Sequence, residues 1–455
     1  MRCATATSPR VSRAKALYGA LTRPPSFHRM ASDAAPAPTA LPAQAEGMRA
    51  LRAAVEDKSR RTKTIEGLRA LREGPDAKSV FLLDQFGVLH DGKVAYPCAI
   101  ETVRRLHESG ARIFIISNSS RRASGTLKKL GPMGFDPDWF EGVITSGEIT
   151  HTKLNSRNDL LNSRSADELV SESDAENDEG SIDPLDEAFG ELGDRCLHFT
   201  WSKRGAVALD GIEGLVTVDA ETFLEQAAEK EAEKEATTKA AETDTDTRDA
   251  KKDPSEPEDD DEPNGAVDFL LAHGTECVNG AGETDKERAL TAEDTPIEEM
   301  KTLLMAAAKE SLPLVVANPD LVTVGGTDGL LPMPGTLASW YSEMPGAGPI
   351  YLMGKPSLVV YETLAELTKA EKSSTVAVGD SLEHDVNGAA AYGIDVVFVC
   401  GGIHAEELGY DLENLVAQNV GDGKNVRHVD ARAIETLADD SNCARPTHAV
   451  PVFRW

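Results

Sequence analysis

The stretch from Phe81 to Gly92, FLLDQFGVLHDG, constrains the fold of this chain more than any other segment. Apolar residues lead into Asp84, and glycines follow at positions 87 and 92. Such a pattern is typical of a buried parallel strand that ends in a carboxylate on a tight loop. Open α/β sheets bind their ligands at this edge, beyond the carboxyl ends of the strands. The stretch therefore predicts an α/β fold with Asp84 at the ligand-binding edge.

Later segments of the chain are expected to converge on Asp84. They are Ile113–Asn118, Gly354–Pro356 and Val376–Asp385. Between the first two strands, an apolar helical face follows Pro97, and Gly110 ends the helix, which makes one βαβ unit. The same alternation returns after residue 350. We therefore predict a Rossmann-like, three-layer core with a parallel sheet and an inserted α/β cap domain.

The domain boundaries follow from where the alternating pattern is interrupted. We expect the core to comprise residues 46–146 and 347–455, and the cap to comprise residues 147–346. The cap carries two acidic insertions, near 155–193 and 225–265, that we expect to be disordered, and an Ala/Glu/Lys-rich helix over 221–241 that protrudes. Residues 165–194 and 225–262 account for −22 of the net charge of −30, so the low pI reflects these insertions.

Residues 1–45 have a different composition from the rest. The first 32 residues contain six Lys or Arg and no Asp or Glu, and an Ala/Pro-rich spacer follows up to residue 45. This is the composition of an organelle transit peptide, for a mitochondrion or a chloroplast, since it contains no continuous apolar segment of a secretory signal. A disordered tail of a cytoplasmic protein is the alternative.

The overall composition argues against several classes of function. No basic patch of the kind that binds nucleic acid is present, and no apolar run approaches the length of a membrane span. The six cysteines form no CxxC pair, so neither a zinc site nor a disulfide framework is expected. We expect neither nucleic acid nor membrane as a partner.

The residue types at the predicted strand ends favour phosphate chemistry. Asp84, Asp380 and Asp385 are hard oxygen ligands of the kind that Mg²⁺ takes, and a carboxylate beside such an ion can attack phosphorus. Lys355 would neutralise phosphoryl oxygens, and the Ser117 hydroxyl would orient one of them. The set predicts a magnesium-dependent site for a phosphorylated substrate.

Taken in order, these motifs resemble those of the haloacid dehalogenase-like (HAD) hydrolase superfamily. They are Asp84-x-x-Gly87-Val88, Ser117-Asn118-Ser119, Lys355 and Gly379-Asp380-x-x-x-x-Asp385. The insertion between the second and third motifs resembles subclass IIA, with its large α/β cap, which includes nitrophenyl-phosphatase-like and phosphoglycolate-phosphatase-like enzymes. The resemblance implies a phosphatase-type hydrolase of a small phosphorylated metabolite, and it leaves open whether the caps pair in a homo-oligomer.

The resemblance also implies a role for each matching residue. Asp84 would be the nucleophile that becomes an aspartyl phosphate. Lys355 and Ser117 would be the other catalytic residues, and Lys355 would stabilise negative charge. Phosphate would be bound by Ser117, Asn118 and Lys355, and Mg²⁺ by Asp84, the backbone carbonyl of Phe86, Asp380 and Asp385. In the cap, Asn318 and Asp320 would face the leaving group or brace the cap hinge. A turn formed by Asn318-Pro319-Asp320 is the alternative interpretation of that segment.

The sequence departs from the family at Phe86. Family phosphatases carry a second Asp there, which protonates the leaving alcohol and then activates water, and a phenyl ring can do neither. General acid–base help is worth roughly 10²- to 10⁴-fold, so ordinary phosphomonoester hydrolysis should be slow. A substrate with a good leaving group, such as an acyl phosphate, would not need the acid, and His90 or Asp91 on the same loop is a candidate substitute. Alternatively, the chain is a catalytically impaired protein that binds a phosphometabolite or has a regulatory role.

Overall fold

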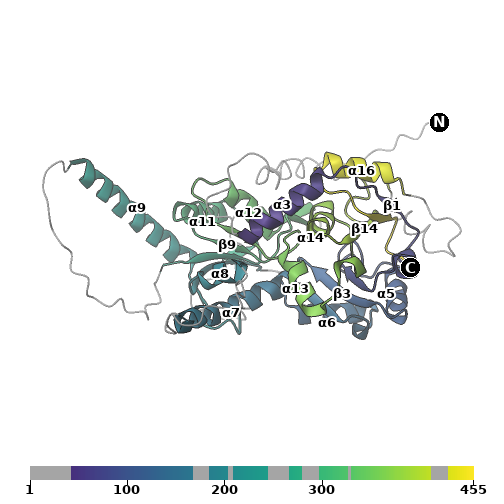
Figure 1. Ribbon diagram of the computed structural model, residues 1–455. Helices are drawn as coiled ribbons and strands as arrows, with labels where there is room; N and C mark the ends of the chain where they lie inside the picture. Colours follow the sequence, from purple (N-terminus) through teal and green to yellow (C-terminus); the bar gives the residue numbers. More distant parts are fainter. Residues whose placement is uncertain are drawn as a thin grey trace.

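The computed structural model describes residues 42–167, 184–202, 207, 209–243, 266–278, 297–325, 329–410 and 429–455 (Figure 1). Most of the expected transit peptide and spacer, and much of both acidic insertions, lie outside these residues. Helix α3 (Pro42–Glu56) begins within the expected spacer and leads into the core.

The core is built on a parallel sheet. Among the described residues this sheet has seven strands, in the order β1-β15-β14-β13-β2-β3-β4. Their bounds are β1 Lys63–Thr64, β2 Val80–Leu83, β3 Arg112–Ser117, β4 Gly142–Thr145, β13 Thr375–Gly379, β14 Asp395–Val399 and β15 His448–Val450. Strand β2, which leads into Asp84, lies in the interior of the sheet between β13 and β3. Strands β1 and β15 were not predicted from the sequence.

Helices cover both faces of this sheet, which confirms the predicted three-layer α/β core. Along β2, Phe81 and Leu83 face one apolar cluster while Val80 and Leu82 face the other, as the two-residue period of a strand requires. The first cluster includes residues of α4 (Arg69–Arg72), α5 (Ala99–Glu108) and α6 (Ala123–Leu130). The second includes residues of α3, α13 (Val359–Thr368), α14 (Asn387–Tyr392) and α16 (Ala431–Asp440).

The inserted cap contains a second parallel sheet. Its strand order is β12-β9-β7-β5-β6, and β8 pairs antiparallel with β5. The bounds are β5 Arg195–Thr200, β6 Val216–Thr217, β7 Phe269–Ala272, β8 Cys277–Val278, β9 Leu314–Val316 and β12 Ile350–Leu352, and a separate hairpin joins β10 (Val322–Gly325) to β11 (Gly329–Pro332). Helices α11 (Ile297–Lys309) and α12 (Pro334–Ser342) pack on one face of this sheet.

The expected domain boundary at residue 347 is wrong by one strand. The sequence assigns Ile350–Leu352 to the core, but this strand, β12, pairs with β9 at the edge of the cap sheet. A short apolar strand looks the same in either sheet, because its partner is set by contacts distant in sequence. The chain therefore re-enters the core only after Leu352, immediately before Lys355.

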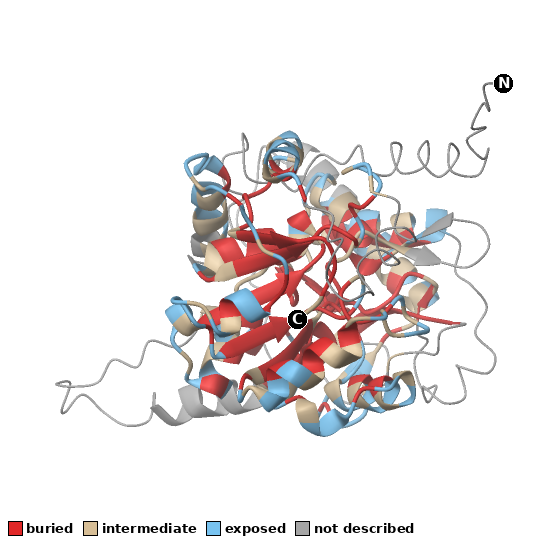
Figure 2. Cartoon of the chain, turned by 90° about the vertical axis from the view of Figure 1, so that its right-hand side faces the viewer, coloured by how far each residue is buried: buried red, intermediate tan, exposed pale blue. Residues whose placement is uncertain are grey.

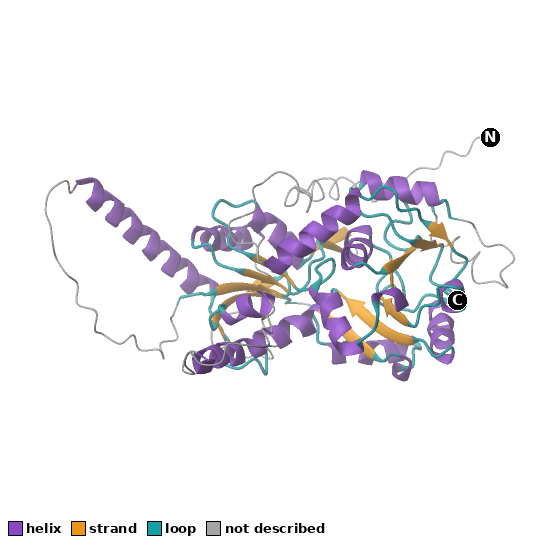
Figure 3. Ribbon diagram, in the orientation of Figure 1, coloured by secondary structure: helices purple, strands orange, loops and turns teal. Residues whose placement is uncertain are grey.

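The expected disorder of the acidic insertions is also partly wrong. Helix α7 (Ser146–Asp167) continues through residue 155, and α8 (Pro184–Gly190) follows the gap in the described residues. Residues 225–243 belong to α9 (Ala220–Thr243), the long helix that protrudes from the body in Figures 1 and 3, as predicted for 221–241. None of the helices in the described part of the chain has the length and apolar content that crossing a membrane requires.

Core and cap share one apolar cluster. It runs from Phe114 of the core sheet through Leu154 of α7 and Phe189 of α8 to Phe269 and Tyr351 of the cap sheet. Figure 2 shows buried residues, in red, gathered in the interior and exposed ones at the surface. The cap is therefore packed against the core over a broad apolar surface, in addition to the chain crossings that link them.

Candidate active site

The site lies at the carboxyl edge of the core sheet. Asp84 follows β2, Ser117 ends β3, and Asp380 follows β13. Strand register places these ends at one level, because Leu83 is opposite both Ile115 of β3 and Val378 of β13. The sequence predicted this convergence correctly, since parallel strands end at the same edge of a sheet.

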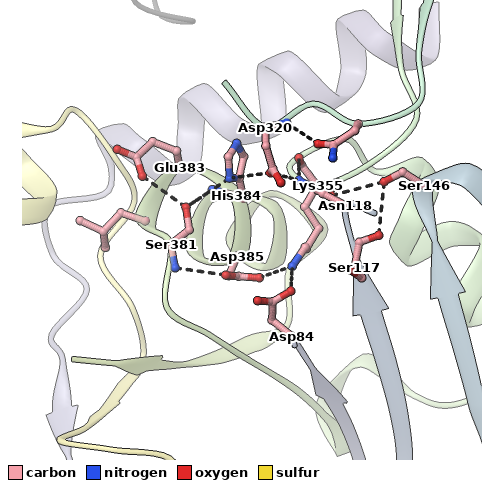
Figure 4. Close-up of polar contacts among 12 residues, drawn as sticks. Asp84, Ser117, Asn118, Ser146, Asp320, Lys355, Ser381, Glu383, His384 and Asp385 are labelled. Atoms are coloured by element: carbon pink, nitrogen blue, oxygen red, sulfur yellow. Dashed lines mark hydrogen bonds and ion pairs between the residues drawn. The ribbon is translucent and has the colours of Figure 1, made fainter. Parts of the chain in front are cut away.

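Lys355 joins two of the predicted aspartates (Figure 4). Its Nζ donates to Oδ1 of Asp84 at 2.6 Å and to Oδ1 of Asp385 at 2.7 Å, and the lysine side chain is 3% exposed. Burial alone would lower the pKa of Lys355, but the charges of Asp385 and Asp84 outweigh it, so the pKa is raised and the amine stays protonated. The lysine is thus a fixed cation between two carboxylates.

The acidic cluster carries more negative charge than Lys355 can balance. Carboxylate oxygens of Asp84, Asp380 and Asp385 all lie within 4.8 Å of one another. Burial raises the pKa of Asp84 to about 7 despite the opposing charge of Lys355, and burial followed by the charge of Asp84 raises the pKa of Asp380 well above its ordinary value. Three buried carboxylates beside one ammonium fit a divalent cation, because such an ion would offset their desolvation.

Backbone groups hold Asp380 and Asp385 in place. The Ile403 amide donates to Oδ2 of Asp380 at 2.8 Å, and the Ser381 amide donates to Oδ2 of Asp385 at 3.1 Å. A side chain at Gly87 or Gly402 would overlap the Asp380 carboxylate. These glycines let two loops close around the metal-ligand candidate. Sequence analysis did not identify residues 401–403 as part of the site.

Asn118 is predicted to bind phosphate, but its amide is occupied by protein groups. Its Nδ2 donates to Oδ1 of Asp320 at 2.8 Å and to the Lys355 carbonyl at 3.0 Å, which uses both amide hydrogens. Its Oδ1 accepts from the Lys355 amide at 2.8 Å. The Asn118 side chain therefore has no donor left for a phosphate. Ser117 is half-buried at the end of β3, where its Oγ accepts from the Ser119 amide at 3.3 Å.

Phe86 and His90 pack against each other on the Asp84 loop. The Phe86 side chain is 49% exposed, and its ring lies edge-to-face with His90, with centroids 5.6 Å apart. His90 is buried and accepts from the Gly92 amide through Nδ1, at 3.0 Å. Burial, followed by the charge of Lys129, lowers the pKa of His90 to about 4. A buried, neutral imidazole is poorly suited to protonate a leaving group, and these contacts describe a packing residue.

A carboxylate of the cap, that of Asp320, lies at the site. Asn318 is buried, and its Oδ1 accepts from the Asp320 amide at 2.9 Å, which is the turn that the sequence suggests. Oδ1 of Asp320 lies 3.4 Å from Nδ1 of His384 and also accepts from Asn118. Figure 4 shows Asp320 between these two core residues. His384 carries no motif signal beyond its place next to Asp385.

Two segments of the chain match family models. Residues 81–173 match the model described as haloacid dehalogenase-like hydrolase, and residues 352–422 match a HAD-hydrolase-like model. Both segments are thus similar to haloacid dehalogenase-like hydrolases. The two matched segments lie on either side of most of the cap, and they include Asp84, Ser117, Lys355, Asp380 and Asp385.

Two curated relatives are similar to about a fifth of the chain. A dihydroxyacetone phosphatase from Corynebacterium glutamicum is 34% identical over 89 residues, which is 20% of this chain and 32% of the relative. An acid sugar phosphatase from Staphylococcus haemolyticus is 29% identical over 101 residues, or 22% of this chain and 38% of the relative. The chain thus spans about a third of the length of these relatives.

Solved structures of the same class are similar at low identity. A haloacid dehalogenase-like hydrolase from Brucella suis is 20% identical with a TM-score of 0.48, covering 86% of this chain and 99% of that one. A 4-nitrophenylphosphatase from Thermotoga maritima is 20% identical with a TM-score of 0.42, covering 73% of this chain and 90% of that one.

Proposed function

We propose that this HAD-like protein is a magnesium-dependent phosphatase of a small phosphorylated metabolite, with Asp84 as its nucleophile. The observation that carries the proposal is the bridge of Lys355 between Asp84 and Asp385, next to Asp380, at the carboxyl edge of the sheet. The matched relatives, a dihydroxyacetone phosphatase and an acid sugar phosphatase, support a phosphate monoester as substrate.

The geometry suggests the following reaction. An oxygen of Asp84 attacks the phosphorus, the bond to the leaving oxygen breaks, and the phosphoryl group stays on Asp84 as an acyl phosphate. Water then attacks that phosphorus, which releases phosphate and restores the carboxylate. Lys355 offsets negative charge beside Asp84, and Ser117 orients a phosphoryl oxygen. Mg²⁺, held by Asp84, Asp380, Asp385 and the Phe86 carbonyl, would screen the repulsion between carboxylate and phosphate.

Phe86 restricts which substrates react quickly. No carboxylate stands at position 86, and His90 is buried and neutral at neutral pH. Asp91 accepts from the amides of Val94 and Lys93, which lower its pKa, so it is a poor acid at neutral pH. The leaving group therefore receives little help from the Asp84 loop. We therefore propose that substrates whose leaving groups need no proton react faster than alkyl phosphates. Acyl phosphates and the phosphate esters of acidic phenols are such substrates.

A substrate screen tests the proposal. The full chain and its Asp84→Asn variant are assayed with Mg²⁺ against dihydroxyacetone phosphate, sugar phosphates, acetyl phosphate and 4-nitrophenyl phosphate. Turnover that depends on Asp84 and Mg²⁺, and that is fastest for acetyl and 4-nitrophenyl phosphate, is the expected result. If no substrate reacts faster than with the Asp84→Asn variant, the phosphatase proposal fails.

A binding or regulatory role is the second candidate. The exposed Phe86 favours it, because an apolar side chain replaces the expected acid two residues after Asp84. Retention of the Lys355-linked aspartates argues the other way. Calorimetric binding of a phosphometabolite with Mg²⁺, without hydrolysis, would select this role.

The location and assembly of the protein follow as lesser proposals. The acid-free composition of the first 32 residues supports import into a mitochondrion or a chloroplast, with the cytoplasm as the alternative. A fluorescent protein fused after residue 45 would distinguish the three compartments. Pairing through the cap is a family expectation, and sedimentation of the full chain would test it.

A further inference from the structure

The side chain of Asp320, a cap residue, contacts core residues at the site. Its Oδ1 accepts from Asn118 Nδ2 at 2.8 Å and lies 3.4 Å from His384 Nδ1. Asn118 follows β3, and His384 lies on the short helical segment Leu382–Val386 that carries Asp385. One carboxylate of the cap therefore contacts two loops of the core (Figure 4).

Asn118 links Asp320 to Lys355, because its side chain is hydrogen-bonded to both residues. Its amide pairs with both backbone groups of Lys355, accepting from the nitrogen at 2.8 Å and donating to the carbonyl at 3.0 Å. The remaining hydrogen of Nδ2 goes to Asp320. A side-chain amide held by three such bonds has little rotational freedom, so it fixes the backbone from which Lys355 extends toward Asp84 and Asp385.

The cap turn at Pro319 and Asp320 is closely packed against the core. A Cβ on Gly354 would lie 2.6 Å from Oδ1 of Asn118 and 2.7 Å from Cδ of Pro319. On the other side of the turn, a Cβ on Gly335 would lie 2.6 Å from the carbonyl oxygen of Asp320. Glycines from two different segments thus allow the cap turn to sit directly against Asn118.

We propose that Asp320 is a positioning residue: seated with the cap, it orients Asn118 and through it holds Lys355 between Asp84 and Asp385. This inference rests on the proposed phosphatase function and deepens it. In this arrangement the cap stabilises the reactive geometry of the core, and Asp320 acts on catalysis through Asn118 and His384 without touching the phosphate ester.

A reciprocal exchange of the two side chains tests the proposal. Asp320→Ala removes the acceptor, and Asn118→Asp places two carboxylates face to face while removing the donor to Lys355. In the double variant Asn118→Asp/Asp320→Asn the amide and the carboxylate have exchanged places, so the bond between positions 118 and 320 can form again. Kinetics are measured with 4-nitrophenyl phosphate and dihydroxyacetone phosphate, and thermal unfolding is measured without substrate.

Misplacement by about 1 Å can lower a rate about 100-fold. We expect Asp320→Ala to lower kcat by about 10- to 100-fold, equally for both esters, and to change KM by less than about threefold. Asn118→Asp should lower both kcat and the unfolding temperature further. Adding Asp320→Asn to it should recover at least about tenfold in kcat and part of the unfolding temperature, because the bond is restored.

Asp219→Asn is the matched control. Asp219 is a cap carboxylate that accepts from the Thr222 amide at 2.8 Å, a role that asparagine can also perform, so this variant should keep wild-type kinetics. The proposal is overturned if Asp320→Ala raises KM for one ester and not the other, which is the behaviour of a substrate contact, or if the exchange gives no recovery. If the wild type shows no turnover that depends on Asp84, the phosphatase function fails, and recovery of the unfolding temperature still decides whether positions 118 and 320 hold one another.

Discussion

Phe86 stands two residues after Asp84, and its side chain is half exposed. Gly92 makes room for the ring, since a Cβ there would lie 2.6 Å from Cζ of Phe86. A carboxylate at position 86 would occupy the same exposed place and could protonate an alkoxide leaving group. We expect Phe86→Asp to raise kcat/KM for dihydroxyacetone phosphate by about 10²- to 10⁴-fold, the usual contribution of a general acid.

The matched control for that change is Phe86→Asn, because asparagine has nearly the same shape as aspartate and no acidic proton. The same two variants should differ little on acetyl phosphate, whose leaving group needs no proton. Equal rates for Phe86→Asp and Phe86→Asn on dihydroxyacetone phosphate would show that the site has a role other than ester hydrolysis.

Asp380 is expected to reduce stability when no cation is bound. It is a buried carboxylate next to two others, and the single ammonium of Lys355 pairs with those two. Asp380→Asn should keep the bond from the Ile403 amide and remove a carboxyl group whose ionisation burial opposes. We expect it to raise the free energy of unfolding in EDTA by about 1–3 kcal/mol and to abolish the stabilisation that Mg²⁺ gives the wild type.

Thermal unfolding with EDTA and with Mg²⁺ measures both effects. Asp439→Asn is the control, because Asp439 is paired with Arg445 at 2.6 Å, so its loss should lower stability slightly in both conditions. A wild-type-like response of Asp380→Asn to Mg²⁺ would remove Asp380 from the ligand set.

Among the strands, the sequence predicted those that end in site residues better than β1 and β15 at the edge of the sheet. The strands before Asp84 and Asp380 have long apolar runs followed by Asp or Gly, whereas β1 is the exposed pair Lys63–Thr64 and is defined only by pairing with β15. The role of Asn118 was not predictable either. Its partners Asp320 and Lys355 lie 202 and 237 residues away in sequence, and no local pattern encodes such bonds.

Strands β5 and β7 bring together two histidines that the sequence did not single out. Nε2 of His198 on β5 lies 3.0 Å from Nδ1 of His273, just beyond β7, and both rings are buried. Burial, followed by the charge of His151, lowers the pKa of His273 to about 3. An unfolded histidine titrates near 6.5, so between these values the unfolded chain binds more protons, and stability is present above pH 6.5 and lost as the pH falls toward 3.

His273→Asn should therefore flatten the acid side of the stability profile. Between about pH 6.5 and 5 the wild type should lose about 2 kcal/mol more than this variant, as measured by urea unfolding at each pH. His107→Asn, at an exposed position on α5, is the control and should follow the wild type. Parallel profiles for wild type and His273→Asn would show that His273 takes up no proton on acid unfolding.

For the whole molecule, the shared apolar cluster between core and cap has a consequence for folding. Residues of both sheets and of the helices α7 and α8 between them are buried in one cluster, so separating cap from core would expose apolar surface from each. Each Å² of such surface costs about 25 cal/mol, which makes unfolding of the cap alone unfavourable. We expect a single calorimetric transition in which the calorimetric and van't Hoff enthalpies agree.

Variants in the shared cluster and outside it test this coupling. Leu154 on α7 and Phe189 on α8 are fully buried in the cluster, so Leu154→Ala and Phe189→Ala should each lower the unfolding temperature of that one transition. Leu303→Ala on α11, in the separate cluster on the outer face of the cap sheet, is the comparison. If core and cap are thermodynamically coupled, it too should shift the single transition as a whole. Two resolved transitions, with Leu303→Ala moving only one of them, would show that the cap unfolds independently and that Asp320 is held at the site by its local contacts alone.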